Sequence, residues 1–125
     1  TDDLKKVLLS PVESGLDYLH SSMRRFWESE FEGSEENLAY WTKKISNIPT
    51  IGVGSVGLDS DFIDMTAPSK PASIDKAIDD ISKEKYDLLA VGRALLSDHE
   101  WVLKMKEGRL KDVIPYSKEA LLKLY

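Results

Sequence analysis

The segment Asp87-Leu88-Leu89-Ala90-Val91-Gly92-Arg93 is the strongest indication of fold class in this sequence. Its residues 88–91 are all apolar, and an unbroken apolar run is typical of a parallel strand that is covered on both faces. Glycine and arginine follow the run directly, so the segment ends in residues suited to a turn or a binding loop. We therefore predict a buried parallel strand over residues 86–91.

Two further strands are predicted upstream, at residues 16–20 and 49–53, where short apolar stretches occur. The segment between residues 21 and 33 is polar, aromatic and irregular, which indicates a long loop. Helical patterns separate the three strands, and strands that alternate with helices are joined in parallel by right-handed crossovers. The sequence therefore predicts an α/β fold with about three parallel strands.

Most of the predicted helices begin at a residue that commonly caps helices, and their apolar residues recur at helical spacing. The helix after Ser73 is expected to bury one face against the sheet, formed by Ile74, Ala77, Ile78 and Ile81. The predicted helices are residues 1–14 with a kink or restart at Pro11, residues 35–46 capped by Ser34, and segments that follow Ser73, Asp98 and Ser117.

The composition excludes several classes of protein. The chain has 125 residues, a net charge of −5, no cysteine, and two histidines that are far apart in sequence. A disulfide scaffold, thiol catalysis and a metal site are therefore not expected. The acidic balance argues against a nucleic-acid partner, and no apolar run approaches the roughly 20 residues of a membrane span. The acidic start is unlike a signal peptide, so we expect a cytoplasmic protein.

Two of the predicted strands end in glycine, and this pattern has three possible interpretations. Residues 52–57, Gly-Val-Gly-Ser-Val-Gly, match the dinucleotide-binding fingerprint, but no helix follows at the required distance. A flexible turn is the second possibility. The third is a phosphate site, because Gly54 and Gly92 end neighbouring strands and Arg93 can add a charge-assisted contact. In α/β barrels, phosphate sites are commonly built from the loops after the last two strands.

Two stretches of the sequence are distinctive: Ile51-Gly52-Val53-Gly54-Ser55-Val56-Gly57-Leu58, and residues 87–98, which end in Val91-Gly92-Arg93-Ala94-Leu95-Leu96-Ser97-Asp98. Both stretches resemble the NADH:flavin oxidoreductases of the Old Yellow Enzyme family. Residues 15–20 are similar to the start of that family's sixth barrel strand. Trp101 and residues 107–109 and 114–116 are similar to its closing helix and tail. The resemblance covers essentially the whole chain, and His99 stands where the family usually has proline.

The resemblance implies that residues 1–125 are the C-terminal portion of an FMN-binding (β/α)₈ barrel, with strands six to eight and the closing helices. The intact enzyme would use NAD(P)H to reduce a small-molecule substrate through FMN. By this similarity the flavin phosphate is bound by Gly54, Ser55, Val56, Gly92 and Arg93. The family's catalytic residues match no position here and would lie upstream, so we expect this chain alone to be inactive. A complete barrel typically needs about 250 residues, so a chain of 125 residues is too short to form one by itself.

Two alternatives remain open for the function of the chain. It could be a stand-alone phosphate-binding α/β module, or a catalytically inactive fragment that self-associates to cover unpaired strand edges. Because three barrel strands leave two unpaired edges, we expect the isolated fragment to form a homo-oligomer. For the other candidate residues, a structural role is favoured over a functional one. We expect His20 to be a hydrogen-bonded histidine, Phe26 and Trp27 to pack locally in a loop, Trp41 and Trp101 to be core residues, and Lys104, Lys106, Arg109 and Lys111 to form a solvated face.

Overall fold

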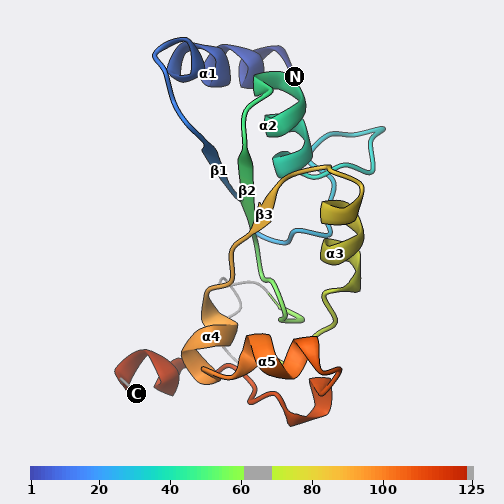
Figure 1. The fold of residues 1–125 in the computed structure, drawn as a ribbon, viewed down its shortest axis with the longest axis vertical. Coiled ribbons are helices and arrows are strands. Elements are labelled where there is room, and N and C mark those ends of the chain that lie inside the picture. The colour runs from blue at the N-terminus through green and yellow to red at the C-terminus, as the bar shows by residue number, and fades with distance from the viewer. Residues whose placement is uncertain (61–68, 124–125) are drawn as a thin grey trace.

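The computed structural model describes residues 1–60 and 69–123. Its centre is a parallel three-stranded sheet in the order β1-β2-β3, formed by β1 (Leu19–Ser22), β2 (Thr50–Val53) and β3 (Leu88–Leu89) (Figure 1). Helices α1 (Asp2–Glu13), α2 (Leu38–Ser46) and α3 (Asp75–Ser82) alternate with these strands. The predicted α/β class with three parallel strands is therefore confirmed. None of the described helices has the length and apolar character needed to cross a membrane.

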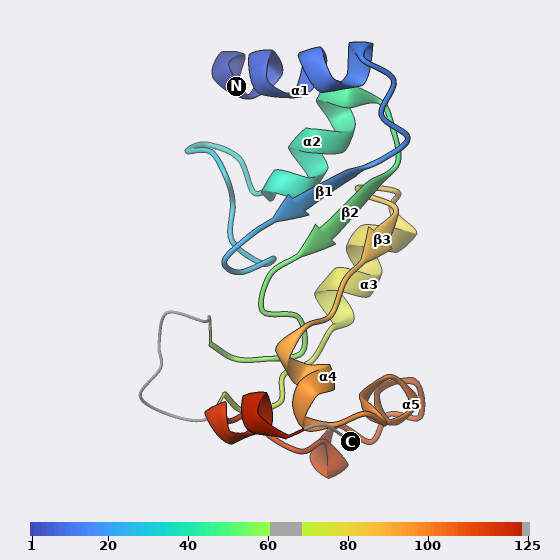
Figure 2. The same ribbon diagram turned by 90° about the vertical axis from the view of Figure 1, so that its left-hand side faces the viewer.

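The helices lie on one side of the sheet. Helix α2 packs against β1 and β2, α3 packs against β3, and α1 packs against α2. Figure 1 shows α2 and α3 on the same side, and Figure 2 shows the strands in front of them. The opposite face of the sheet has no helix over it among the residues that the structure describes.

Side chains along the strands alternate between these two faces. In β2, Thr50 and Gly52 are buried toward the helices, whereas Ile51 and Val53 point to the opposite side and are half-buried. The register pairs His20 with Ile51, and Ile51 with Leu88, so these side chains share the open face. We call the set His20, Ser22, Ile51, Val53 and Leu88 the open sheet face.

The prediction that residues 86–91 form a strand covered on both faces is wrong. Only Leu88 and Leu89 pair with β2, and 61% of Leu88 is exposed. Leu89 faces the helices and packs against the hydrophobic core. An unbroken apolar run is typical of a strand with helices packed on both of its faces, but the described helices α2 and α3 lie on one face of this sheet alone.

Several element boundaries differ from the predicted ones. Helix α2 begins after Asn37, not Ser34, because the Asn37 side chain accepts a hydrogen bond from the Tyr40 amide at 3.0 Å and donates one to the Phe26 carbonyl at 2.9 Å. Ser34 accepts from the Glu36 amide within the preceding loop instead. Asn37 is buried and Ser34 is not, and the Asn37 side chain can therefore join the start of α2 to the loop that contains Phe26.

Three other expectations about helices are corrected. Helix α1 continues through Pro11 without a restart. In α3, Ala77 is buried, but Ile78 is 56% exposed and does not contribute to the buried face. The segment after Ser117 forms the 3₁₀ helix η2 (Lys118–Leu122), and an unpredicted short helix α4 (Arg93–Ser97) follows β3.

The hydrophobic core lies beyond the carboxyl ends of the strands, where α4 and α5 (Trp101–Lys106) close the molecule (Figure 1). An antiparallel bridge between Ser69 and Tyr116, with backbone hydrogen bonds of 3.0 and 3.1 Å, ties the C-terminal segment to this region. The buried members of the core are Phe26, Val56, Leu58, Ala77, Ala94, Trp101, Val113 and Tyr116.

A buried ion pair holds this region together and corrects another prediction. Lys104 is not on a solvated face: it is buried, and its Nζ donates to Asp98 Oδ2 at 2.8 Å. Asp98 is 1% exposed and also accepts hydrogen bonds from the amides of Glu100 and Ile114. Burial opposes ionisation of Asp98, but the hydrogen bonds from Lys104 and the two amides outweigh it and hold the pKa of Asp98 below its usual range.

We predict that Asp98→Asn destabilises the chain by about 3–5 kcal/mol, because the variant removes the buried carboxylate 2.8 Å from the Lys104 ammonium and leaves the exposed Glu100 carboxylate at 3.8 Å as its nearest counter-charge among the described residues. Urea unfolding at neutral pH measures this loss. Because the pKa of Asp98 is lower in the folded chain than in the unfolded chain, its ionised form stabilises the fold at pH values above the unfolded pKa of about 3.9. This stabilisation is lost as the pH falls through the folded pKa. The wild type and the variant should therefore converge in acid.

Asp79→Asn is the matched control, because Asp79 pairs with Lys83 at 2.6 Å on the exposed surface of α3. Exposed pairs contribute little to stability, so this variant should unfold close to the wild type. An equal loss in both variants would contradict the role assigned to the buried pair.

Candidate functional site

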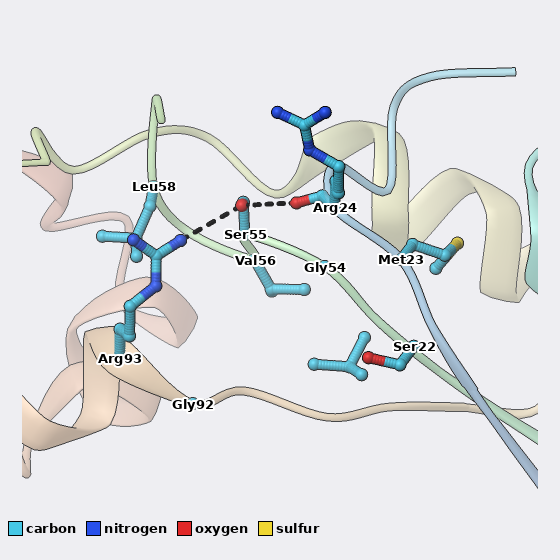
Figure 3. A pocket seen from close by; sticks show the side chains of 10 residues that line it. Ser22, Met23, Arg24, Gly54, Ser55, Val56, Leu58, Gly92 and Arg93 are labelled. Carbon is cyan, nitrogen blue, oxygen red and sulfur yellow. Dashed lines mark hydrogen bonds between the residues drawn. The ribbon is translucent and has the colours of Figure 1, made fainter. Parts of the chain in front are cut away.

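A cavity of about 180 Å³ lies at the carboxyl ends of all three strands (Figure 3). The five residues predicted to bind a phosphate, Gly54, Ser55, Val56, Gly92 and Arg93, all line it. They come from two segments that are far apart in sequence, after β2 and after β3. The structure therefore brings the predicted site residues together. The remaining lining residues are Ser22, Met23, Arg24, Val53 and Leu58.

The charge of the cavity lining is opposite to that of the chain. Among the described residues, the lining includes two arginines, Arg24 and Arg93, and no aspartate or glutamate, although the chain as a whole has a net charge of −5. A small cavity with cationic side chains and no carboxylate favours an anionic ligand. In the part of the chain that the structure describes, no group of three histidine, aspartate or glutamate side chains could hold a metal ion.

Contacts with three described residues hold Arg93 in place. Its Nη2 donates to Ser55 Oγ at 3.1 Å and to the Ser60 carbonyl at 3.0 Å. The guanidinium carbon lies 5.3 Å from the centre of the Tyr116 ring, within the range of a cation–π contact. These contacts fix the plane of the guanidinium beside the cavity, so the side chain is preorganised to meet a ligand.

The two predicted glycines have different structural roles. A Cβ on Gly54 would lie 2.8 Å from the Met23 carbonyl oxygen, so Gly54 is required by the loop after β1, which packs directly on it. A Cβ on Gly92 would meet nothing within 4 Å. The space beside Gly92 is therefore open, as close approach of a ligand to the backbone requires.

Sequence reasoning missed the contribution of β1 to this site. Residues 22–24 line the cavity because the Met23 amide donates to the Val53 carbonyl at 2.8 Å, which extends the pairing of β1 and β2 beyond the strands. The predicted long loop 21–33 obscured this, since Ser21 and Ser22 belong to β1. The available signal was the parallel topology itself, which brings the carboxyl end of every strand to one edge.

The other candidate residues lie outside the cavity. His20 is on the open sheet face and is exposed. Phe26 is buried in the core with Trp27 packed edge-on against it at 5.3 Å, as expected for local packing. Trp101 is buried in the core, also as expected. The prediction that Trp41 belongs to the core is wrong: it is half-buried outside the core cluster and packs edge-on against Phe31 and Tyr40.

Comparison with known proteins gives one line of evidence about relationship. No protein-family model matches the sequence. The chain is 35% identical over 117 residues to a protein from Thermoanaerobacter brockii named NADH oxidase, an alignment that covers 87% of this chain. The chain spans 16% of the length of that relative. It is therefore distantly related to one part of a much longer protein whose name describes an NADH-dependent oxidoreductase.

We predict that Gly54→Ala destabilises the chain by about 1–3 kcal/mol, because the new methyl group would overlap the Met23 backbone and push the loop after β1 away from the cavity. Gly92→Ala is the matched control and should cost about 1 kcal/mol at most, because its methyl group would enter open space. Thermal unfolding of both variants makes the comparison. Equal destabilisation would contradict the contact between the loop after β1 and Gly54.

Proposed function

We propose that this chain is part of an NADH-dependent oxidoreductase of the Old Yellow Enzyme type and that its cavity binds the phosphate of FMN. The observation that supports this most directly is the convergence of Gly54, Ser55, Val56, Gly92 and Arg93 around one cavity. The name of the Thermoanaerobacter brockii relative agrees with an oxidoreductase that uses NADH. Neither observation depends on the other.

The one-sided sheet supports an origin in a (β/α)₈ barrel. Doubly wound sheets have helices on both faces, whereas in a barrel every helix lies outside and the inner face of the sheet closes on itself. Here α2 and α3 are on the same side, and on the open sheet face Ile51 is in register with Leu88, with Val53 two residues further along β2. We infer that residues 1–125 supply strands six to eight, with the open sheet face toward the barrel interior.

The residues present fit the phosphate end of FMN. The open space beside Gly92 allows an anion to approach the backbone, and Arg93 can donate charge-assisted hydrogen bonds to phosphate oxygens. A cavity of about 180 Å³ is smaller than the roughly 300–1,000 Å³ of pockets that enclose whole ligands, so this chain would hold the phosphate alone. When bound, FMN would supply hydride transfer between NAD(P)H and a small-molecule substrate.

The catalytic residues of the intact enzyme would lie in the segments that build the rest of the barrel. Active sites of such barrels are assembled from the loops after several different strands. This chain would contribute to binding and orienting the cofactor and would have no activity of its own. The phosphate site would then act as an anchor that fixes the position of the flavin relative to those loops.

We predict that the chain binds FMN and that Arg93→Ala weakens this binding about 10–100-fold, the effect of removing charge-assisted hydrogen bonds. Flavin fluorescence quenching measures the affinity, and riboflavin, which lacks the phosphate, should bind far more weakly. NADH oxidation in the same samples should not exceed that of free FMN.

Arg109→Ala is the control for this measurement, because Arg109 pairs with Glu107 at 2.6 Å and does not line the cavity. FMN affinity should be unchanged in this variant. Wild-type protein that binds neither FMN nor inorganic phosphate would refute the proposed site. Equal affinity for FMN and for unrelated phosphate monoesters would instead favour a general phosphate-binding module.

We also propose that the isolated chain self-associates through its open sheet face. Apolar side chains there are uncovered, and the outer edges of β1 and β3 pair with no other described strand. Leu88 lies beside one of these edges and is 61% exposed. A second copy placed against this face would cover both the apolar surface and the unpaired edge.

Leu88→Glu should therefore convert a dimer or larger assembly into a monomer, because a carboxylate would be buried in the contact. Light scattering coupled to gel filtration gives the mass. Leu122→Glu is the control, since Leu122 is 88% exposed on η2 and lies away from the sheet. A wild-type monomer at working concentration would contradict self-association.

A further inference from the structure

The hydroxyl group of Ser55 lies where the loops after the three strands meet (Figure 3). It donates a hydrogen bond to the Arg24 carbonyl at 2.7 Å and accepts one from Arg93 Nη2 at 3.1 Å. Arg24 follows β1, Ser55 follows β2 and Arg93 follows β3. A single side chain therefore links the carboxyl ends of all three strands.

The chemistry of the partners fixes the direction of both hydrogen bonds. A carbonyl oxygen can only accept and a guanidinium can only donate, so the single hydroxyl proton of Ser55 points to Arg24. That proton is not available to a phosphate oxygen. The Ser55 side chain is therefore unsuited to bind an anion directly, although its backbone amide stays beside the cavity.

The hydroxyl group instead controls how Arg93 is presented. Both hydrogen bonds that Arg93 makes within the described part of the chain use Nη2, one to Ser55 and one to the Ser60 carbonyl. The ring of Tyr116 lies against the guanidinium. With both Nη2 protons and one face of the guanidinium occupied, Nη1 and Nε keep protons that can each donate a single charge-assisted hydrogen bond to an oxyanion.

The backbone of Ser55 points to the same role for the side chain. Its φ is +51°, in the left-handed region that glycine adopts without strain and serine does not. Glycine would fit this turn better, but glycine has no hydroxyl to join Arg24 to Arg93. Strain of this kind persists where the surrounding contacts hold the residue in place.

We propose that Ser55 is a positioning residue that orients Arg93 for a phosphate monoester and does not itself contact that ligand through its side chain. This inference rests on the proposed phosphate site and deepens it, because it assigns separate roles to two residues that the sequence groups together. Arg93 supplies the charge that meets the ligand. Ser55 occupies Nη2 and so determines which guanidinium nitrogens remain to meet the ligand.

The first test compares Ser55→Ala with Ser55→Gly in the full chain. Both variants lack the hydroxyl group, but glycine relieves the strained backbone whereas alanine retains it. We expect both variants to bind FMN about tenfold more weakly than the wild type, in the range for a lost charge-assisted hydrogen bond. Their stabilities should differ, because Ser55→Gly should unfold at a higher urea concentration than Ser55→Ala. If FMN affinity instead follows stability, so that Ser55→Gly binds like the wild type, the positioning role is overturned.

The second test does not depend on FMN. Ser55→Gly, Arg93→Ala and the double variant form a cycle in urea unfolding, which measures the coupling between the hydroxyl and the guanidinium. Each variant raises the equilibrium constant of unfolding by some factor. We expect the factor for the double variant to be several-fold smaller than the product of the factors for the two single variants. Additive effects would overturn the inference. Coupling without any FMN binding would retain the Ser55–Arg93 contact and refute the proposed function alone.

Discussion

Parallel pairing of the three strands fixes where the helices and the cavity lie. Because β1, β2 and β3 run in the same direction, each connection must cross from one end of the sheet to the other, and helices α2 and α3 make these crossings on one face. The same constraint places every strand's carboxyl end at a single edge. The cavity and its two arginines are located there for that reason.

A sheet covered on one face has limited apolar burial, and polar contacts hold the elements in register. Asp87 accepts from the Thr50 amide at 2.9 Å and from Lys43 Nζ at 2.8 Å, which ties β3 to β2 and α2. Burial opposes ionisation of Asp87, but these two donors outweigh it and hold its pKa below the usual range. Behind the sheet, burial and the nearby negative charge of Asp80 raise the pKa of Tyr86 to about 12.

Much of the site could be predicted, because two neighbouring strands that both end in glycine, one of them followed by arginine, form a more specific pattern than either strand end alone. Gly54 and Gly92 identify strand ends, and parallel topology then implies that Arg93 meets Ser55. The sequence could not assign the burial of Lys104, because its partner Asp98 has to be brought to it by the turn that joins α4 and α5. Ser34 was predicted as a helix cap in place of Asn37 because both are capping residues, and only contact with Phe26 decides between them.

The sequence by itself determined the α/β class, the parallel direction of the strands and the residue types available to bind an anion. These follow from local periodicity and from side-chain chemistry, which act over a few residues. Tertiary structure alone decided that Leu88 is exposed, that Gly54 accommodates Met23, and that the Ser55 hydroxyl joins Arg24 to Arg93. Each of these depends on which segments pack against a residue from a distant part of the chain, and no local pattern encodes that.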